Sequence, residues 1–206
     1  MSVLKPFATW AALSNLAALH AATTGFRGQV VELALVNARG ETLFLERVRP
    51  SCPVEAGAQS FHGISDADLA GLPTIANHWP RLTELLTAHQ VVSYNAEFFV
   101  EALSRTLDAV MPRGWEYPDG DEPGFSAAYQ PFYSLSSSAG CVMNAYTPVF
   151  DNRNSFGNGL RSAKLAVACE REGVRTSDLP EIQTALGSAL RTLRLVQALA
   201  ARAGAA

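Results

Sequence analysis

The hydrophobic pattern changes its period along the chain, and this change limits the possible folds. Residues 15–22, 29–37 and 42–49 are apolar or β-branched runs separated by turn residues, among them Thr-Thr-Gly at 23–25. Such runs are typical of three successive strands. From Ile75 onward, apolar residues recur every three or four positions, which indicates helices. This order of elements predicts an α/β fold around a mixed sheet.

The middle of the chain continues this alternation. Ser65 followed by acidic residues predicts a helix start, and helical spacing indicates helices over 75–88 and 96–111. Residues 90–94 are predicted as a fourth strand, and a fifth is expected near residues 132–135. Further helices are expected over residues 141–150, 163–172 and 179–202.

Length and composition limit the class of protein. The chain has 206 residues, which suits a single domain over 1–206 with a long Pro- and Gly-rich insertion at about 112–140. A net charge of −3 argues against coating nucleic acid by bulk charge. No apolar stretch is long enough for a membrane span or a signal peptide. With three widely spaced cysteines, we expect a cytoplasmic protein that binds no membrane.

Four short stretches carry a resemblance to a known family. They read LHAATTG at 19–25, FHGISDADL at 61–69, VVSYNAEFF at 91–99 and QTALGSA at 183–189. They resemble, in order, the D-x-E-T-T-G, I-H-G-I-T-x-x-x-L, H-N-A-x-F-D and H-x-A-L-x-D-A motifs of the DnaQ-like (DEDDh) 3′–5′ exonucleases. The resemblance implies an RNase H-like fold, with a five-stranded mixed sheet flanked by helices.

The family's chemistry falls on altered positions. The resemblance places its four metal-binding carboxylates at His20, Ala22, Phe99 and Ser188, and its general-base histidine at Gln183. Family members hydrolyse a phosphodiester with two Mg²⁺ or Mn²⁺ ions, which need anionic oxygen ligands. A methyl group and a phenyl ring cannot ligate a metal, and glutamine accepts no proton near neutral pH. We therefore expect no metal cofactor and a catalytically inactive pseudo-exonuclease.

An active enzyme with a rebuilt site stays an alternative. Glu32 lies on the second predicted strand, and Glu97 stands two residues before Phe99. Asp151 and Glu181 are further candidates. A rebuilt site has to satisfy the strict coordination geometry of Mg²⁺.

Loss of the acids changes what the site attracts. A site without carboxylates is close to neutral, or slightly positive if His20 is protonated, so a single strand or a 3′ end can dock without a metal. DNA and RNA stay equally open. His20 is alternatively a tolerated replacement, Phe99 a core residue, His62 a turn residue and Tyr94 a packing residue. The candidate nucleic-acid contacts are His20, Thr23, Thr24, Gly25, His62, Tyr94 and Asn95.

The insertion supports a second alternative, a protein-interaction or scaffold subunit. Its aromatic side chains can stack on unpaired bases or anchor a partner protein or a second copy of the chain in a homodimer. Asp119, Asp121 and Glu122 lie close by and favour a protein contact. The aromatic residues are Trp115, Tyr117, Phe125, Tyr129, Phe132 and Tyr133.

Overall fold

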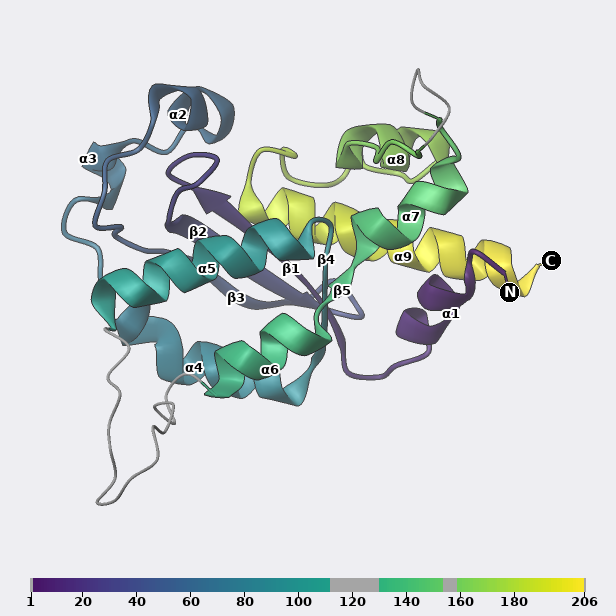
Figure 1. Ribbon diagram of the computed structural model, residues 1–206, viewed down its shortest axis with the longest axis horizontal. Coiled ribbons are helices and arrows are strands. Elements are labelled where there is room, and N and C mark those ends of the chain that lie inside the picture. The colour runs from purple at the N-terminus through teal and green to yellow at the C-terminus, as the bar shows by residue number, and fades with distance from the viewer. Residues whose placement is uncertain (1, 112–129, 154–158, 206) are drawn as a thin grey trace.

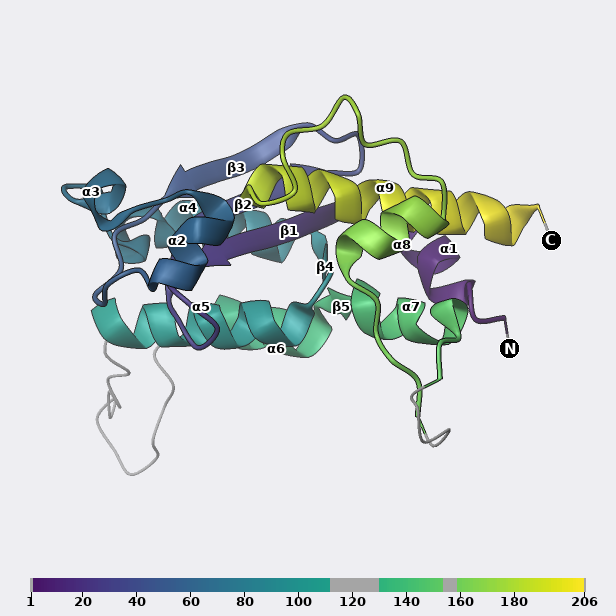
Figure 2. The ribbon, with the colours of Figure 1, turned by 90° about the horizontal axis from the view of Figure 1, so that it is seen from above.

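A five-stranded mixed sheet lies between two layers of helices (Figures 1 and 2). The computed structural model describes residues 2–111, 130–153 and 159–205. The strands are β1 (Leu16–Thr23), β2 (Val30–Asn37), β3 (Thr42–Arg47), β4 (Gln90–Ser93) and β5 (Gly140–Cys141). The helices are α1 (Lys5–Ala11), α2 (Ala56–His62), α3 (Asp66–Leu69), α4 (Ile75–Ala88), α5 (Ala96–Val110), α6 (Gln130–Ser138), α7 (Val142–Phe150), α8 (Leu165–Arg171) and α9 (Ala185–Gly204).

The sheet has the strand order β3-β2-β1-β4-β5. β1 pairs antiparallel with β2 and parallel with β4, so it is the central strand. All but one of its residues are buried, as expected of a strand that is covered on both faces. The mixed sheet predicted from the sequence is confirmed.

Side-chain alternation along β1 divides the core. Leu19 joins the core on the face covered by α4, α5 and α6, which we call the α5-side core. Ala18 joins the core on the opposite face, under α1, α7, α8 and α9, which we call the α9-side core. His20 and Ala22 are even-numbered positions like Ala18, so they point away from the α5-side core.

Several predicted boundaries hold, and the helix predicted at Ser65 is confirmed. The Ser65 side chain caps α3 in a reciprocal capping box with Asp68. α1 and α2 were not predicted from the sequence. The last helix begins at Ala185 rather than at residue 179, because Thr184 caps it by accepting a hydrogen bond from the Gly187 N–H at 3.0 Å.

The predicted fifth strand near residues 132–135 is wrong. These residues lie in α6, where Phe132 and Leu135 stand one helical turn apart and are both buried in the α5-side core. The fifth strand is the two-residue β5 instead. Tyr133 also lies in α6, and its ring contacts Phe132. Trp115, Tyr117, Phe125 and Tyr129 belong to residues 112–129, which lie outside the described residues.

Candidate functional site

The floor of the candidate site is formed by β1 and β2. In the antiparallel register, His20 lies opposite Ala34, and Ala22 lies opposite Glu32. Directly opposed residues project from the same face of a sheet. The four side chains therefore share one face, and Glu32 is the only acid among them.

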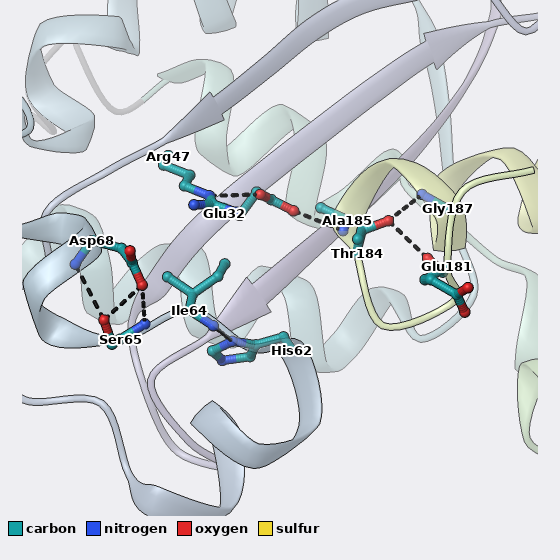
Figure 3. Close-up of polar contacts among 10 residues, drawn as sticks. All are labelled: Glu32, Arg47, His62, Ile64, Ser65, Asp68, Glu181, Thr184, Ala185 and Gly187. Carbon is teal, nitrogen blue, oxygen red and sulfur yellow. Dashed lines mark hydrogen bonds and ion pairs between the residues drawn. The ribbon is translucent and has the colours of Figure 1, made fainter.

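Glu32 is 8% exposed, and both of its carboxylate oxygens are engaged (Figure 3). Oε1 accepts a hydrogen bond from the Ala185 N–H at 2.9 Å, at the first turn of α9. Oε2 accepts one from Arg47 Nε at 3.0 Å. A carboxylate at a helix N-terminus is stabilised by the helix dipole, and the guanidinium balances its charge. Glu32 thus holds α9 against the sheet.

His20 is a neutral side chain at physiological pH. Burial lowers its pKa from 6.5 to about 4, and the nearby Glu32 carboxylate opposes this shift only in part. The positive charge considered for this position in the sequence analysis is therefore absent at pH 7. The imidazole is half-buried and polar, and it contributes no positive charge to the site at pH 7.

Phe99 is a core residue. Its side chain is 2% exposed and packs in the α5-side core together with Leu19 and Leu103. Phe99 thus has the core-packing role that was one of the two roles predicted for it.

Ser188 and Gln183 lie where the last segment of the chain enters α9. The Ser188 hydroxyl donates to the Ile182 carbonyl at 2.6 Å, and its residue is 4% exposed. Arg191 ties the same loop to the helix by donating to the carbonyls of Pro180 and Gly187. The Ser188 hydroxyl is thus a structural donor, while the side chain of Gln183 stays half-buried.

The turn after β1 uses its polar side chains internally. The Thr23 hydroxyl donates to the Gly25 carbonyl at 2.8 Å, and the Thr24 hydroxyl accepts from the Gln29 N–H at 3.0 Å. Gly25 is buried, and a Cβ there would lie 2.2 Å from the Glu55 carboxyl group. The side chains of Thr23 and Thr24 are buried and hydrogen-bonded within the protein, and the predicted contact of these residues with nucleic acid stays a prediction.

His62 locks this turn to the loop before α3. Its Nδ1 accepts from the Ile64 N–H at 3.1 Å, so the proton must lie on Nε2, which donates to the Thr23 carbonyl at 3.1 Å. Figure 3 shows the ring lying against the Ile64 backbone. His62 is thus a turn residue, and its ring nitrogens are engaged within the protein.

The remaining candidates lie at the end of β4. The Tyr94 side chain is 6% exposed, and its hydroxyl donates to the Ala163 carbonyl at 2.7 Å. Its ring therefore packs in the α9-side core, which is one of the two roles considered for it, and a contact of Tyr94 with nucleic acid stays a prediction. The half-buried Asn95 caps α5 by accepting from the Phe98 N–H at 3.4 Å.

Two exposed aromatic residues lie beside these turns, and sequence reasoning missed them. Phe26 follows the Thr-Thr-Gly turn and is 80% exposed, and Phe61 precedes His62 and is 64% exposed. Phe26 also contacts the half-buried Phe98, with ring centroids 6.0 Å apart. We call Phe26 and Phe61 the aromatic pair. Their positions next to two recognisable motifs were available in the sequence, but their exposure was not.

The side chains at these positions do not fit a pair of divalent metal ions. Both Glu32 oxygens are already engaged, while Glu97 is exposed on α5 and Asp151 is exposed after α7. In residues 2–111, 130–153 and 159–205, no group of three or more His, Cys, Asp or Glu side chains is placed to hold a metal. The absence of a metal cofactor stays a prediction.

Comparison with known proteins identifies the class. The Exonuclease (RNase_T) family profile matches residues 23–137, which is more than half of the chain, so the chain belongs to this family. The chain is 27% identical over 186 residues to the uncharacterized exonuclease CP81 of Escherichia phage 186, covering 89% of this chain and 87% of the relative. In the described residues, no helix is long and apolar enough to span a membrane.

Solved structures agree on the fold. Exonuclease X in complex with 5′-overhanging duplex DNA superposes with a TM-score of 0.58 at 17% identity, covering 89% of this chain and 90% of that one. E. coli Exonuclease I in complex with a dA16 oligonucleotide gives a TM-score of 0.62 at 16% identity, covering 90% of this chain and 41% of that one. The RNase H-like exonuclease fold is therefore established.

Proposed function

We propose that this protein binds the end of a single-stranded nucleic acid and does not cleave it. The observation that carries the proposal is the arrangement of Glu32, whose two oxygens are held by Arg47 and by the first turn of α9. A carboxylate in this state supplies no ligand for a metal, and it leaves the floor close to neutral.

Charge around the floor supports docking of a phosphate without a metal. A cluster of free carboxylates repels phosphate until cations fill it. Here the Glu32 charge is balanced by Arg47, and His20 is neutral at pH 7. Arg27 is exposed beside Phe26 and makes no ion pair with the described residues. The floor itself therefore carries no uncompensated negative charge that would repel a phosphate.

The aromatic pair supports recognition of unpaired bases. An aromatic side chain contributes ~1–3 kcal/mol when it stacks on a base, and stacking needs no particular sequence. The loop that carries Phe26 is fixed by the Thr24 contacts and by Arg105 Nε, which donates to the Gly28 carbonyl at 3.2 Å. A fixed loop presents the ring without a large loss of conformational entropy on binding.

The relatives support a nucleic acid as the ligand. Exonuclease I is solved with a dA16 oligonucleotide, and Exonuclease X is solved with duplex DNA. The same exposed rings also suit a protein partner, since exposed aromatic residues are enriched in protein interfaces. A protein-interaction subunit is thus the competing function, and the following experiment separates the two.

The experiment measures fluorescence anisotropy of a labelled single-stranded oligonucleotide at low and moderate salt, with and without Mn²⁺. We expect salt-sensitive binding and an oligonucleotide that stays intact on a denaturing gel. Phe26→Ala should weaken binding about tenfold through lost stacking, whereas the matched control Leu45→Ala, which shortens an exposed side chain on β3, should not. Binding that is absent, or a Mn²⁺-dependent shortening of the oligonucleotide, contradicts the proposal.

A further inference from the structure

A second exposed surface carries positive charge that the candidate site does not account for. Arg153, Arg161 and Lys164 are all exposed, and the chain has no Asp or Glu between residues 152 and 169. In a protein with a net charge of −3, such a local excess of cations is not a consequence of overall composition. We call these three residues the basic ridge.

Most other arginines of the described chain are neutralised by a neighbouring acid. The Arg39 guanidinium contacts Glu41 at 2.8 Å, and Arg194 contacts Asp178 at 2.8 Å. Further pairs of this kind are Arg47–Glu32, Arg81–Glu84, Arg105–Glu101 and Arg202–Glu172. Arg153 and Lys164, by contrast, make no ion pair with any described residue. Their charges are therefore available to an external anion.

The fold fixes this ridge in relation to the candidate site. Arg153 and Leu160 form an isolated antiparallel bridge, and the Arg161 N–H donates to the Asn152 carbonyl at 2.8 Å. The next contact is the hydrogen bond from the Tyr94 hydroxyl to the carbonyl of Ala163, the residue before Lys164. Arg153 and residues 160–164 are thus held by contacts with the rest of the described chain.

The same Tyr94 anchor connects the ridge to the aromatic pair. Tyr94 precedes Asn95, which caps α5, and the first turn of α5 carries Phe98, whose ring contacts Phe26. Lys164 is the N-cap residue of α8. In Figures 1 and 2, α8 lies beside α9, whose first turn closes the floor of the site. The Tyr94–Ala163 hydrogen bond and the Phe26–Phe98 ring contact thus attach both surfaces to the segment that runs from the end of β4 into α5.

We propose that the basic ridge binds the phosphates of the single strand as it leaves the aromatic pair. This proposal rests on the proposed function, because a strand end at Phe26 must continue across a neighbouring surface. Successive phosphates of one strand give a row of anions, and the exposed charges of Arg153 and Lys164, which make no ion pair with a described residue, match such a row. The ridge sets how many nucleotides the protein covers.

Oligonucleotide length and salt dependence test the ridge separately from the site. Binding of a labelled trinucleotide reports on the aromatic pair alone, and binding of a labelled 12-mer reports on both surfaces. In the double variant Arg153→Gln/Lys164→Gln, we expect ~10-fold weaker binding of the 12-mer at low salt and unchanged binding of the trinucleotide. The slope of log K against log salt should fall by about 1.4, because each phosphate contact to a single strand contributes about 0.7.

A charge-matched control is Arg39→Gln/Arg81→Gln, which removes two exposed arginines that are already paired with acids. Equal weakening by this control shows a bulk-charge effect and overturns the ridge. An unchanged slope in the Arg153→Gln/Lys164→Gln variant, with trinucleotide binding intact, overturns the ridge and leaves the proposed function standing. If the wild type does not bind the trinucleotide, but Arg153→Gln/Lys164→Gln still weakens binding of the 12-mer, the proposed end-binding site is overturned. The ridge then remains as a phosphate-binding surface.

Discussion

The turn after β1 and the floor beneath it are neighbours in sequence, but they use their side chains differently. In the turn, the Thr23 and Thr24 hydroxyls and the His62 ring each contact backbone groups and hold three segments together. On the floor, His20 is uncharged and Glu32 is engaged by Arg47 and α9. The family resemblance of the chain is therefore carried by residues that maintain the fold. The one acid of the floor, Glu32, also serves the fold, because it holds α9 against the sheet.

The strongest test of this separation introduces an acid at a position that now belongs to the core. Phe99→Asp removes a ring that is 2% exposed and buries a charge without a partner. We expect a loss of at least ~4 kcal/mol in the free energy of unfolding, measured by urea denaturation. Phe98→Asp, one residue earlier and half-buried, is the matched control and should cost clearly less. Equal stability of the two variants would show that position 99 accepts solvent or a cation.

Much of the frame was predictable because it depends on local signals. The three strand runs, the Ser65 cap and the helices at 75–88 and 96–111 follow from periodicity and capping chemistry. The fifth strand was placed wrongly because Phe132 and Leu135 suit either element, and their helical state depends on packing against α4 and α5. β5 has only two residues and leaves no periodic signal.

The candidate site was less predictable than the fold. The motif positions predicted where His20, Ala22 and Ser188 lie. They did not predict the hydrogen-bond partners of the residues around them, such as Glu32. The contact of Glu32 with Ala185 joins residues 153 positions apart. Such a long-range hydrogen bond cannot be read from spacing, and neither can the exposure of Phe26 and Phe61. Tyr94 was ambiguous for the same reason, since only its Ala163 contact shows which way the ring points.

A smaller effect is expected when the pH is lowered, because His20 on the floor of the site then becomes protonated in the unfolded chain. Unfolded His20 takes up a proton below pH 6.5, whereas the folded pKa is about 4. Between these values the unfolded state binds more protons, so stability falls as the pH decreases from 6.5 to 4. The linked loss reaches about 3 kcal/mol at pH 4.

His20→Ala removes this single titration. Between pH 7 and pH 4, the wild type should lose about 3 kcal/mol more of its unfolding free energy than His20→Ala does. Urea denaturation at each pH measures this. Carboxylates that titrate in the same window contribute to both proteins and cancel in the difference. A difference that stays constant with pH would mean that the imidazole is solvated and that burial does not lower its pKa.

The smallest expected effect tests the turn. His62→Ala leaves the Thr23 carbonyl and the Ile64 N–H without their ring partners. Loss of a partner by a partly buried backbone group costs ~1 kcal/mol or more, so we expect about 2 kcal/mol in the free energy of unfolding. Phe61→Ala, the adjacent exposed position, should change stability little and serves as the control.

The same two variants also differ in the anisotropy assay if the two proposals about binding are correct. Phe61→Ala weakens oligonucleotide binding at unchanged stability, while His62→Ala lowers stability and weakens binding only as far as the Phe26 loop loosens. If Phe61→Ala instead lowers stability and His62→Ala weakens binding at unchanged stability, then His62 contacts the nucleic acid and Phe61 stabilises the fold.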